Sequence, residues 1–301
     1  MPAAADPPLA FGPVHVHFGA KAGKYPDGNQ VIVRGRDTVA AFDTPQVANR
    51  IGPALDAVDL VILGHVHEDH MAGLHRLPRA AVHVHEADAE AARSWDGMSR
   101  HYGYPAPVLA ALRPQIEADF HYAPRPDALS YRDGAVWELG GVRVRALHFP
   151  GHTAGHCVLL VEPQGVAFIG DIDLSGFGPY YGDASSDLGA FRRSLARLAD
   201  LPASVWITSH HKGVLTDRAD FLAKLAAFAA RIDEREAKLL GMLADGPRTL
   251  DALVRERLLY PPDHQAPWLD AAERRSIGQH LDELLAAGRV RRAGAAGFAL
   301  A

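Results

Sequence analysis

Three histidines and an aspartate lie within a span of six residues directly after a short apolar run, and no other stretch constrains the fold as strongly. Residues 58–63 are apolar and β-branched enough for a buried strand, and Gly64 marks the point where the backbone must turn. His65 and His67 alternate, so in an extended backbone both imidazoles point to the same face and converge on one cation. Because neutral imidazole is a preferred ligand of zinc-type ions, the stretch predicts a metal site.

Asp69 and His70 complete the stretch at the point where the chain is expected to enter a helix. A carboxylate and an imidazole placed there can hold a second cation beside the first. Another pair, His15 and His17, also alternates on a predicted strand, but no carboxylate or glycine turn accompanies it. We therefore assign that pair a structural role.

Further ligand candidates stand where other apolar runs end. A proline–glycine turn leaves His152 at the end of a strand, whereas His156 has no such turn and is expected to support the site from outside or to pack. Residues 205–208 form the last run of this type, which leads into two consecutive histidines. Of these, His210 is preferred over His211 as a ligand.

An aspartate follows the apolar residues 166–169, directly after the turn at Gly170. A carboxylate just beyond a buried strand is costly unless it is paired or bound to metal. Asp171 is therefore a natural bridge between two cations. Asp173 is the alternative, and Asp171 is preferred because it immediately follows the glycine.

The composition is that of a soluble protein with a substantial core, since 48% of the 301 residues are hydrophobic and 22% are charged. A net charge of −5 provides no general basic field for nucleic acid or an anionic membrane. The single cysteine, Cys157, excludes an internal disulfide. The first ten residues lack an export signal and no apolar run reaches the ~18 residues needed to cross a bilayer, so we expect a cytoplasmic protein with no membrane partner.

Apolar patterning also predicts secondary structure around these sites. Three strands at residues 14–18, 30–33 and 38–42 suggest an antiparallel β opening. Residues 46–58 carry apolar positions at helical spacing. Residues 96–127 are rich in proline and aromatic side chains without a clear period, which predicts an irregular lid or insertion.

In order and spacing, the candidate ligands resemble those of the metallo-β-lactamase superfamily of hydrolases. The resemblance spans roughly residues 14–215 and rests on four motifs: His65-x-His67-x-Asp69-His70, Pro150-Gly151-His152, Gly170-Asp171 and Ser209-His210. It implies an α/β fold of the αβ/βα sandwich type. It also implies how the ligands are grouped: a first cation held by His65, His67 and His152, a second by Asp69, His70 and His210, and Asp171 bridging both.

The resemblance further implies that a metal-bound hydroxide attacks the substrate, because a zinc-type ion lowers the pKa of water to about 7 and polarises the attacked oxygen. The cofactors expected are two Zn²⁺ per chain, or another divalent metal such as Mn or Fe. Asp69 is expected to orient that water or to pass on its proton. Tyr180 and Tyr181, in a glycine-rich aromatic segment after the bridging carboxylate, are candidates to hydrogen-bond a developing oxyanion, with simple packing as an equal alternative.

From about residue 217 the pattern changes to three helices and a two-stranded wing around Gly294 and Gly297. This is the pattern of a winged helix, so we expect a catalytic domain at residues 1–220 and a winged-helix domain at residues 221–301. The pattern resembles the C-terminal domain of the superfamily branch of the lactamase-like protein 2 type.

A winged helix invites a nucleic-acid partner, which five arginines support: Arg274, Arg275, Arg289, Arg291 and Arg292. Acidic side chains on the third predicted helix oppose it: Asp270, Glu273, Asp282 and Glu283. We therefore prefer a structural role for this domain, either packing beside the active-site mouth or forming a homodimer contact.

The function favoured by these features is metal-dependent hydrolysis of an ester, thioester or lactone, with a small molecule as the substrate. A phosphodiesterase or single-strand endoribonuclease is the alternative, suggested by the winged helix. A drug-hydrolysing β-lactamase is less favoured without an export signal, and a mono-iron sulfur oxygenase would use much the same ligands. A non-catalytic DNA regulator is disfavoured by the complete ligand set.

Overall fold

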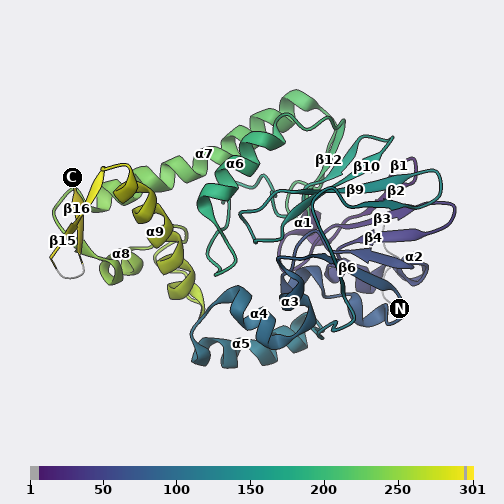
Figure 1. Ribbon diagram of the computed structural model, residues 1–301, viewed down its shortest axis with the longest axis horizontal. Helices are drawn as coiled ribbons and strands as arrows, with labels where there is room; N and C mark the ends of the chain where they lie inside the picture. The colour runs from purple at the N-terminus through teal and green to yellow at the C-terminus, as the bar shows by residue number, and fades with distance from the viewer. Residues whose placement is uncertain (1–6, 295–296) are drawn as a thin grey trace.

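The computed structural model describes residues 7–294 and 297–301. In this part of the chain two mixed β-sheets pack face to face, with helices on their outer sides (Figure 1). The first sheet has the strand order β1-β2-β3-β4-β5-β6-β7, and the second has the order β13-β12-β11-β10-β9-β8. The predicted α/β sandwich is therefore confirmed. The strands are β1 (Leu9–Phe11), β2 (Val14–His17), β3 (Gln30–Arg34), β4 (Val39–Phe42), β5 (Leu60–Ile62), β6 (Ala81–His85), β7 (Leu129–Tyr131), β8 (Val136–Glu138), β9 (Arg143–His148), β10 (Cys157–Glu162), β11 (Val166–Phe168), β12 (Val205–Ile207) and β13 (Val214–Leu215).

The helices before the C-terminal part of the chain are short. They are α1 (Ala20–Gly23), which is a left-handed turn, α2 (Pro53–Asp56), α3 (Ala89–Arg93), α4 (Trp95–Tyr102), α5 (Ala106–Asp119) and α6 (Leu188–Leu198), with 3₁₀ turns η1 (Gln46–Arg50), η2 (Glu68–His70) and η3 (Leu74–Arg76). Among the described residues, no helix is long and apolar enough to cross a membrane.

The pairing of the strands explains where the ligand loops meet. Strands β1 to β4 are antiparallel, as the sequence predicted, and β4 to β7 are parallel. In the other sheet β11 and β12 are parallel. Because the carboxyl ends of parallel strands lie at one edge of a sheet, the loops that follow β5, β11 and β12 converge on the same end of the sandwich.

Three hydrophobic clusters hold these layers together. The cluster between the two sheets includes Phe42 and Phe168, whose rings lie 5.8 Å apart. A second cluster joins the outer face of the first sheet to α3, α4 and α5, and a third joins the outer face of the second sheet to α6 and the following long helix. The central strands of both sheets are thus covered on both faces, which fits the apolar sequences of β4, β5, β10, β11 and β12.

Two of the predicted elements differ in the structure. The single helix expected at residues 46–58 is instead the 3₁₀ turn η1 followed by the short helix α2. The break falls at Gly52, which has φ +58° and precedes Pro53. A residue before proline is disfavoured in the α region, so the helical spacing alone could not carry the helix through this point.

The irregular lid expected at residues 96–127 is wrong, because α4 and α5 occupy most of it. The hydroxyl of Ser94 caps α4 by accepting from the Gly97 N–H at 2.9 Å. Pro105 stands at the N-cap of α5, where a missing N–H costs no intrahelical hydrogen bond. Of the prolines that obscured the pattern, Pro105 and Pro107 lie at the start of α5, Pro114 lies inside it, and Pro124 and Pro126 follow it.

The C-terminal part of the described chain contains three helices and a small sheet. They are α7 (Arg218–Met242), α8 (Leu250–Glu256) and α9 (Leu269–Ala286), with β14 (Arg248–Thr249), β15 (Val290–Ala293) and β16 (Gly297–Leu300) in the order β14-β16-β15. A cluster that includes Leu253, Ile277 and Leu281 packs them together. The strands β15 and β16 pair where the two-stranded wing is predicted, and residues 295–296, which the predicted wing includes, lie outside the described residues.

Helix α7 belongs to two hydrophobic clusters. Phe221 and Phe228, in its first half, pack with the second sheet and α6. Leu239, near its end, packs with α8 and α9. The domain boundary expected between residues 220 and 221 falls near the start of α7. Because the first half of this helix packs on the sandwich, α7 contributes to the cores on both sides of that boundary.

Candidate metal centre

The loop that follows β5 joins the two sheets at the end where the ligands gather. The Gly64 N–H donates to Oδ1 of Asp43 at 2.7 Å, and the Gly64 carbonyl accepts from the Cys157 N–H of the second sheet at 2.7 Å. These bonds fix the start of the predicted metal motif. Its four ligand candidates are all buried: His65, His67, Asp69 and His70.

One group of ligand atoms comes from both sheets. His65 and His67, after β5, meet His152, from the loop between β9 and β10, and Asp171, after β11; their ligand atoms all lie within 4.8 Å of one another. Nε2 of His152 lies 3.1 Å from Nδ1 of His67. The chain thus gathers three imidazoles and a carboxylate at one point.

A second group lies beside the first. It consists of Asp69, His70 and His210, whose ligand atoms also lie within 4.8 Å of one another. Nε2 of His210 is 3.1 Å from Oδ2 of Asp69, and Nε2 of His70 is 3.7 Å from Oδ1 of Asp69. Of the two consecutive histidines, His211 is not in this group and pairs with Asp173 at 3.5 Å.

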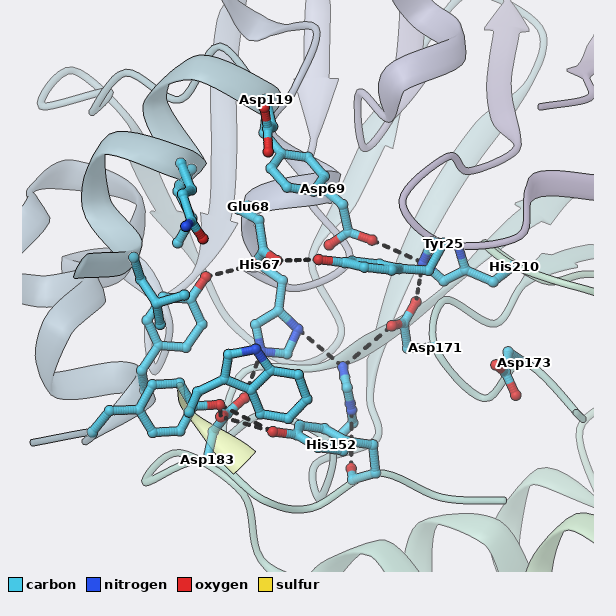
Figure 2. A pocket seen from close by; sticks show the side chains of 18 of the residues that line it. Tyr25, His67, Glu68, Asp69, Asp119, His152, Asp171, Asp173, Asp183 and His210 are labelled. Carbon is cyan, nitrogen blue, oxygen red and sulfur yellow. Dashed lines mark hydrogen bonds and ion pairs between the residues drawn. The ribbon is translucent and has the colours of Figure 1, made fainter. Parts of the chain in front are cut away.

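The Asp171 carboxylate stands between the two groups (Figure 2). Its Oδ2 lies 3.3 Å from Nε2 of His152 and 3.8 Å from Nε2 of His65. Its Oδ1 lies 3.2 Å from Nε2 of His70 and 3.5 Å from Nε2 of His210. One oxygen therefore faces each group, which is the arrangement of a bridging carboxylate.

In four of the ligand histidines, one ring nitrogen forms a hydrogen bond with a residue that belongs to neither group of ligands. Nδ1 of His70 pairs with Oδ2 of Asp43 at 2.8 Å, and Nε2 of His67 pairs with Oδ2 of Asp183 at 2.9 Å. Backbone carbonyls accept from the other two, at 3.0 Å for His152 and 2.8 Å for His210. Such bonds set the tautomer and the orientation of a ligating imidazole.

His156 positions the bridging carboxylate. Its Nδ1 bonds the Phe149 carbonyl at 3.1 Å, and its Nε2 accepts from the Asp171 N–H at 3.2 Å. A Cβ at Gly170, which has φ +56°, would lie 2.6 Å from that same nitrogen. The glycine is therefore required for this contact, and His156 has the supporting position expected for it.

Charges in the centre oppose the effect of burial. Burial lowers the pKa of His67, but the hydrogen bond and the charge of Asp183 outweigh it and raise that pKa to about 9. Burial likewise lowers the pKa of His210, and the charge of Asp171 with the hydrogen bond of Asp69 raises it to about 9. A cation that binds these two imidazoles must therefore displace protons from them.

Several inward-facing atoms fit a cation. Among the described residues, Nε2 of His65, Nε2 of His70 and Oδ1 of Asp171 are buried without a hydrogen-bond partner. Unpaired buried polar atoms are costly, and these three belong to the two groups of ligand residues, whose imidazoles and carboxylates suit a divalent cation. The residues present therefore fit a divalent metal.

The comparison with known families agrees with this geometry. The model of the metallo-beta-lactamase superfamily matches residues 34–210. The chain belongs to this superfamily. A metallo-beta-lactamase family protein from Thermus thermophilus has a similar structure, with a TM-score of 0.70, 27% identity and coverage of 96% of this chain and 99% of that one. A beta-lactamase domain protein from Burkholderia ambifaria is similar in fold, with a TM-score of 0.69, 20% identity and coverage of 100% and 96%.

Curated metallo-beta-lactamase relatives match parts of the chain. An atrochrysone carboxyl ACP thioesterase of Pseudocercospora fijiensis is 31% identical over 46% of this chain and 39% of its own length. The human acyl-coenzyme A thioesterase MBLAC2 is 32% identical over 39% and 42%. The matches thus span about two fifths of these relatives. A beta-lactamase-like protein 2 homolog of Drosophila melanogaster is 24% identical over 83% and 77%. The family match over residues 34–210 thus shows the superfamily, and two of these relatives are named as thioesterases.

The two tyrosine candidates have different surroundings. Tyr180 lines the pocket at the metal centre, and its hydroxyl lies 3.1 Å from that of Tyr104 and donates to Asp183 at 3.2 Å. Tyr181 is fully buried, does not line this pocket, and pairs with Nε2 of His280 at 2.8 Å. The catalytic role considered for Tyr181 is therefore wrong, because its hydroxyl faces α9 rather than the metal centre.

The pocket over the metal centre has a volume of about 490 Å³ and is built from distant segments. Its aromatic walls include Tyr25, Tyr102, Tyr104, Tyr180, Tyr260 and Trp268. Tyr260 and Trp268 flank the start of α9, so the C-terminal part of the chain forms one wall. The expectation that this part packs beside the active-site mouth agrees with the pocket lining.

Sequence reasoning missed several acidic residues of this site. Asp88 joins two ligand loops, since it accepts from the Val66 N–H at 3.2 Å and the Gly155 N–H at 2.7 Å. Asp43 and Asp183 hold ligand imidazoles, and neither stands beside a histidine in the sequence. Asp43 begins the turn sequence Asp43-Thr44-Pro45, but nothing in the neighbouring sequence identifies His70 as its partner.

Proposed function

We propose that this protein is a dinuclear metal-dependent hydrolase that cleaves a thioester, ester or lactone of a small molecule. The observation that carries the proposal is the position of Asp171, whose two oxygens face two separate groups of ligands. One zinc-type cation is assigned to His65, His67 and His152, and the other to Asp69, His70 and His210. When bound, such cations lower the pKa of water toward about 7 and polarise the attacked carbonyl.

Asp69 is the proposed proton acceptor. Burial raises the pKa of its carboxyl, but the charge of His70 and the hydrogen bond of His210 outweigh it and lower that pKa. The group is therefore ionised near neutral pH. An ionised carboxylate at this position can orient an attacking water and accept its proton.

Tyr180 is the proposed donor to the developing oxyanion. Burial and the charge of Asp183 raise the pKa of its hydroxyl well above the ordinary value, so the hydroxyl keeps its proton. A protonated hydroxyl in a dry pocket can stabilise negative charge on a carbonyl oxygen. In the structure this hydroxyl already bonds the Asp183 carboxylate, so the proposed role requires it to turn toward the substrate.

A thioester is the preferred bond within this class. Relatives matched over part of their length are named as thioesterases of an acyl carrier protein substrate and of acyl-coenzyme A. A pocket of about 490 Å³ lies in the usual range for small-molecule sites. The chemistry for thioesters, esters and lactones is the same attack on an acyl carbon, so the three remain one reaction class.

The C-terminal part of the chain, which we assign as a winged helix of the lactamase-like protein 2 type, serves in this proposal as a wall of the active site. Most of the arginines that suggested nucleic acid have partners within the protein. Arg274 pairs with Asp251, and Arg275 donates to the Gly103 carbonyl at 3.0 Å. Arg289 pairs with Glu236. These contacts favour a packing role over a basic surface for nucleic acid.

The proposal is tested on the purified full chain by elemental analysis and by hydrolysis of S-phenylacetyl-N-acetylcysteamine. We expect two zinc-type ions per chain, with hydrolysis lost on chelation and restored by added Zn²⁺. One iron per chain with oxygen uptake would instead support the oxygenase. Cleavage of single-stranded RNA without thioester hydrolysis would support the endoribonuclease, and absence of bound metal would overturn the mechanism.

A further inference from the structure

The lining of the pocket contains carboxyl groups and no permanent cation. Six acidic residues line it: Glu68, Asp69, Asp119, Asp171, Asp173 and Asp183. Among the described residues of the lining there is no lysine or arginine. Figure 2 shows these carboxylates spread around the pocket, with Asp119 and Asp173 away from the ligand cluster.

Besides Asp183, which holds His67, three of these acids are outside both groups of proposed ligands and face the outer chamber, which we define as the pocket beyond the metal ligands. They are Glu68, Asp119 and Asp173. A cation bound by the ligands is not coordinated by them, so they add negative charge or neutral acid groups to the chamber walls. Nearby Arg235 is buried, donates to the Phe177 and Pro179 carbonyls, and does not line the pocket.

Glu68 is held in a fixed position by two aromatic residues from distant parts of the chain. The Tyr102 hydroxyl donates to its Oε2 at 2.5 Å, and the Tyr25 hydroxyl donates to its Oε1 at 3.2 Å. Tyr25 stands at the mouth with 54% of its surface exposed. Glu68 therefore lines the pocket beside the proposed ligands His67 and Asp69, its neighbours in the sequence.

The chemistry of this chamber disfavours anions. Phosphate and carboxylate groups are recognised by arginine, lysine or clustered backbone N–H donors that replace their hydration. The chamber offers aromatic faces, acid groups and the imidazoles of His211 and His264 instead. Whether Glu68 is ionised or protonated, an anion beside it finds no permanent positive side chain, whereas aromatic faces and carboxylates together attract organic cations.

We propose that the outer chamber selects esters and thioesters whose non-reacting part is apolar or aromatic and is neutral or positively charged, with the acid groups of its walls together setting this preference. Substrates that carry phosphate or carboxylate in the chamber are rejected, and coenzyme A thioesters are thus poor substrates. The inference rests on the hydrolase activity proposed above, and names the substrate class of that same site.

The test compares matched thioesters with the metal-loaded full chain at low ionic strength. One set keeps a phenylacetyl group and varies the thiol among thiocholine, N-acetylcysteamine, 3-mercaptopropionate and coenzyme A. A second set keeps N-acetylcysteamine and varies the acyl group among 4-trimethylammoniobutyryl, hexanoyl and glutaryl. We expect kcat/KM for the anionic member of at least one set to be about tenfold or more below that of the neutral member, with the cationic member equal or better. Equal rates throughout both sets, or a preference for coenzyme A, would overturn the inference.

Variants separate the role of Glu68 from a general charge effect. In Glu68→Gln the ratio of kcat/KM between cationic and anionic substrates should fall, and Asp119→Asn at the exposed end of α5 should lower it less. Glu117→Gln is the matched control, because Glu117 is exposed on the same helix, pairs with Arg113 and does not line the pocket. An unchanged ratio in both Glu68→Gln and Asp119→Asn, or an equal fall in the control, would contradict the assignment.

The two proposals fail in different ways. If the metal-loaded protein hydrolyses no thioester, the proposed function fails. Selectivity is then measured without turnover, by calorimetric titration of metal-free protein with benzyltrimethylammonium and with benzenesulfonate. Tighter binding of the cation supports the chamber's selectivity, and tighter binding of the anion overturns it.

Discussion

The metal centre and the outer chamber are built from the chain in opposite ways. Every proposed ligand stands on a loop that directly follows a strand of one of the two sheets, so β-pairing alone brings the ligands together. The chamber instead takes its walls from segments as distant in sequence as Tyr25 and Trp268. The reaction chemistry is thus specified by short motifs, and the substrate selectivity by tertiary packing. Changes in one region should therefore leave the other largely intact.

The largest effect is expected at the bridge between the two ligand groups. In Asp171→Asn the neutral amide cannot offer two anionic oxygens, so bound metal should be lost and the hydrolysis rate should fall about 10³-fold or more. Elemental analysis measures the loss of bound metal, and the rate of hydrolysis of a neutral thioester measures the loss of activity. Asp173→Asn is the matched control and should keep its metal. Loss of metal in Asp173→Asn with retention in Asp171→Asn would reverse the assignment.

A weaker effect is expected one step outside the ligands. Asp183→Asn removes the charge that holds His67, so metal affinity should fall about 10- to 100-fold, as is usual for such supporting partners. Competition with a chromophoric chelator measures this affinity. The same substitution at exposed Asp200 serves as the control. If the two variants bind metal equally well, His67 does not depend on Asp183.

Perturbing the chamber alone should change substrate binding without changing metal binding. Buried Glu273 accepts from the backbone N–H groups of Leu258, Leu259 and Tyr260 at 2.7 to 3.2 Å, which holds Tyr260 in the pocket wall. Glu273→Gln should destabilise the fold by about 1–3 kcal/mol, because an amide cannot accept all of these bonds. KM should rise about threefold to tenfold while metal content is unchanged, by analogy with other lost positioning contacts.

Exposed Asp282 on the same helix provides the control for that experiment, since Asp282→Asn should alter neither quantity. Metal loss in Glu273→Gln would show that the two regions are coupled, and the separation between metal centre and chamber would then be wrong.

The smallest effect is a change in the pH dependence of stability. Burial lowers the pKa of His280 to about 3, below the ordinary 6.5, so the unfolded state takes up a proton that the folded state does not. Stability from this group is complete above about pH 6.5 and is lost as the pH falls toward 3. In His280→Gln the decrease in unfolding free energy from pH 7 to 5 should be smaller by about 2 kcal/mol. Denaturant unfolding of both proteins at both pH values measures this difference.

The same contrast explains what the sequence could predict. His65 and Asp171 each stand beside a glycine at the end of an apolar run, and His67 alternates with His65, so local signals identified all three as ligand candidates. Tyr180 and Tyr181 are neighbours on an irregular loop, and only the contact with His280, far along the chain, determines which of them faces away from the pocket. Glu68 lay inside the predicted motif, but its role depends on hydroxyls from distant segments.

Proline misled the prediction for a physical reason. Pro105 marks a break in periodicity, yet at a helix start it is compatible with the fold, and the helices α4 and α5 that carry part of the chamber wall were therefore missed. A proline that begins a helix differs from one that ends it in which face of the following turn is buried. The buried face is determined by the sheet against which the helix packs, so the local sequence does not show it.

The long helix α7 links these regions in a way that concerns cooperativity. Its 25 residues make a rod about 37 Å long that supplies apolar side chains to the core of the sandwich at one end and to the C-terminal core at the other. Unfolding of either core removes the packing partners of part of α7, and helix formation along α7 is itself cooperative. The two cores are therefore expected to lose their structure in a single transition, and the chamber wall persists for as long as the catalytic sandwich does.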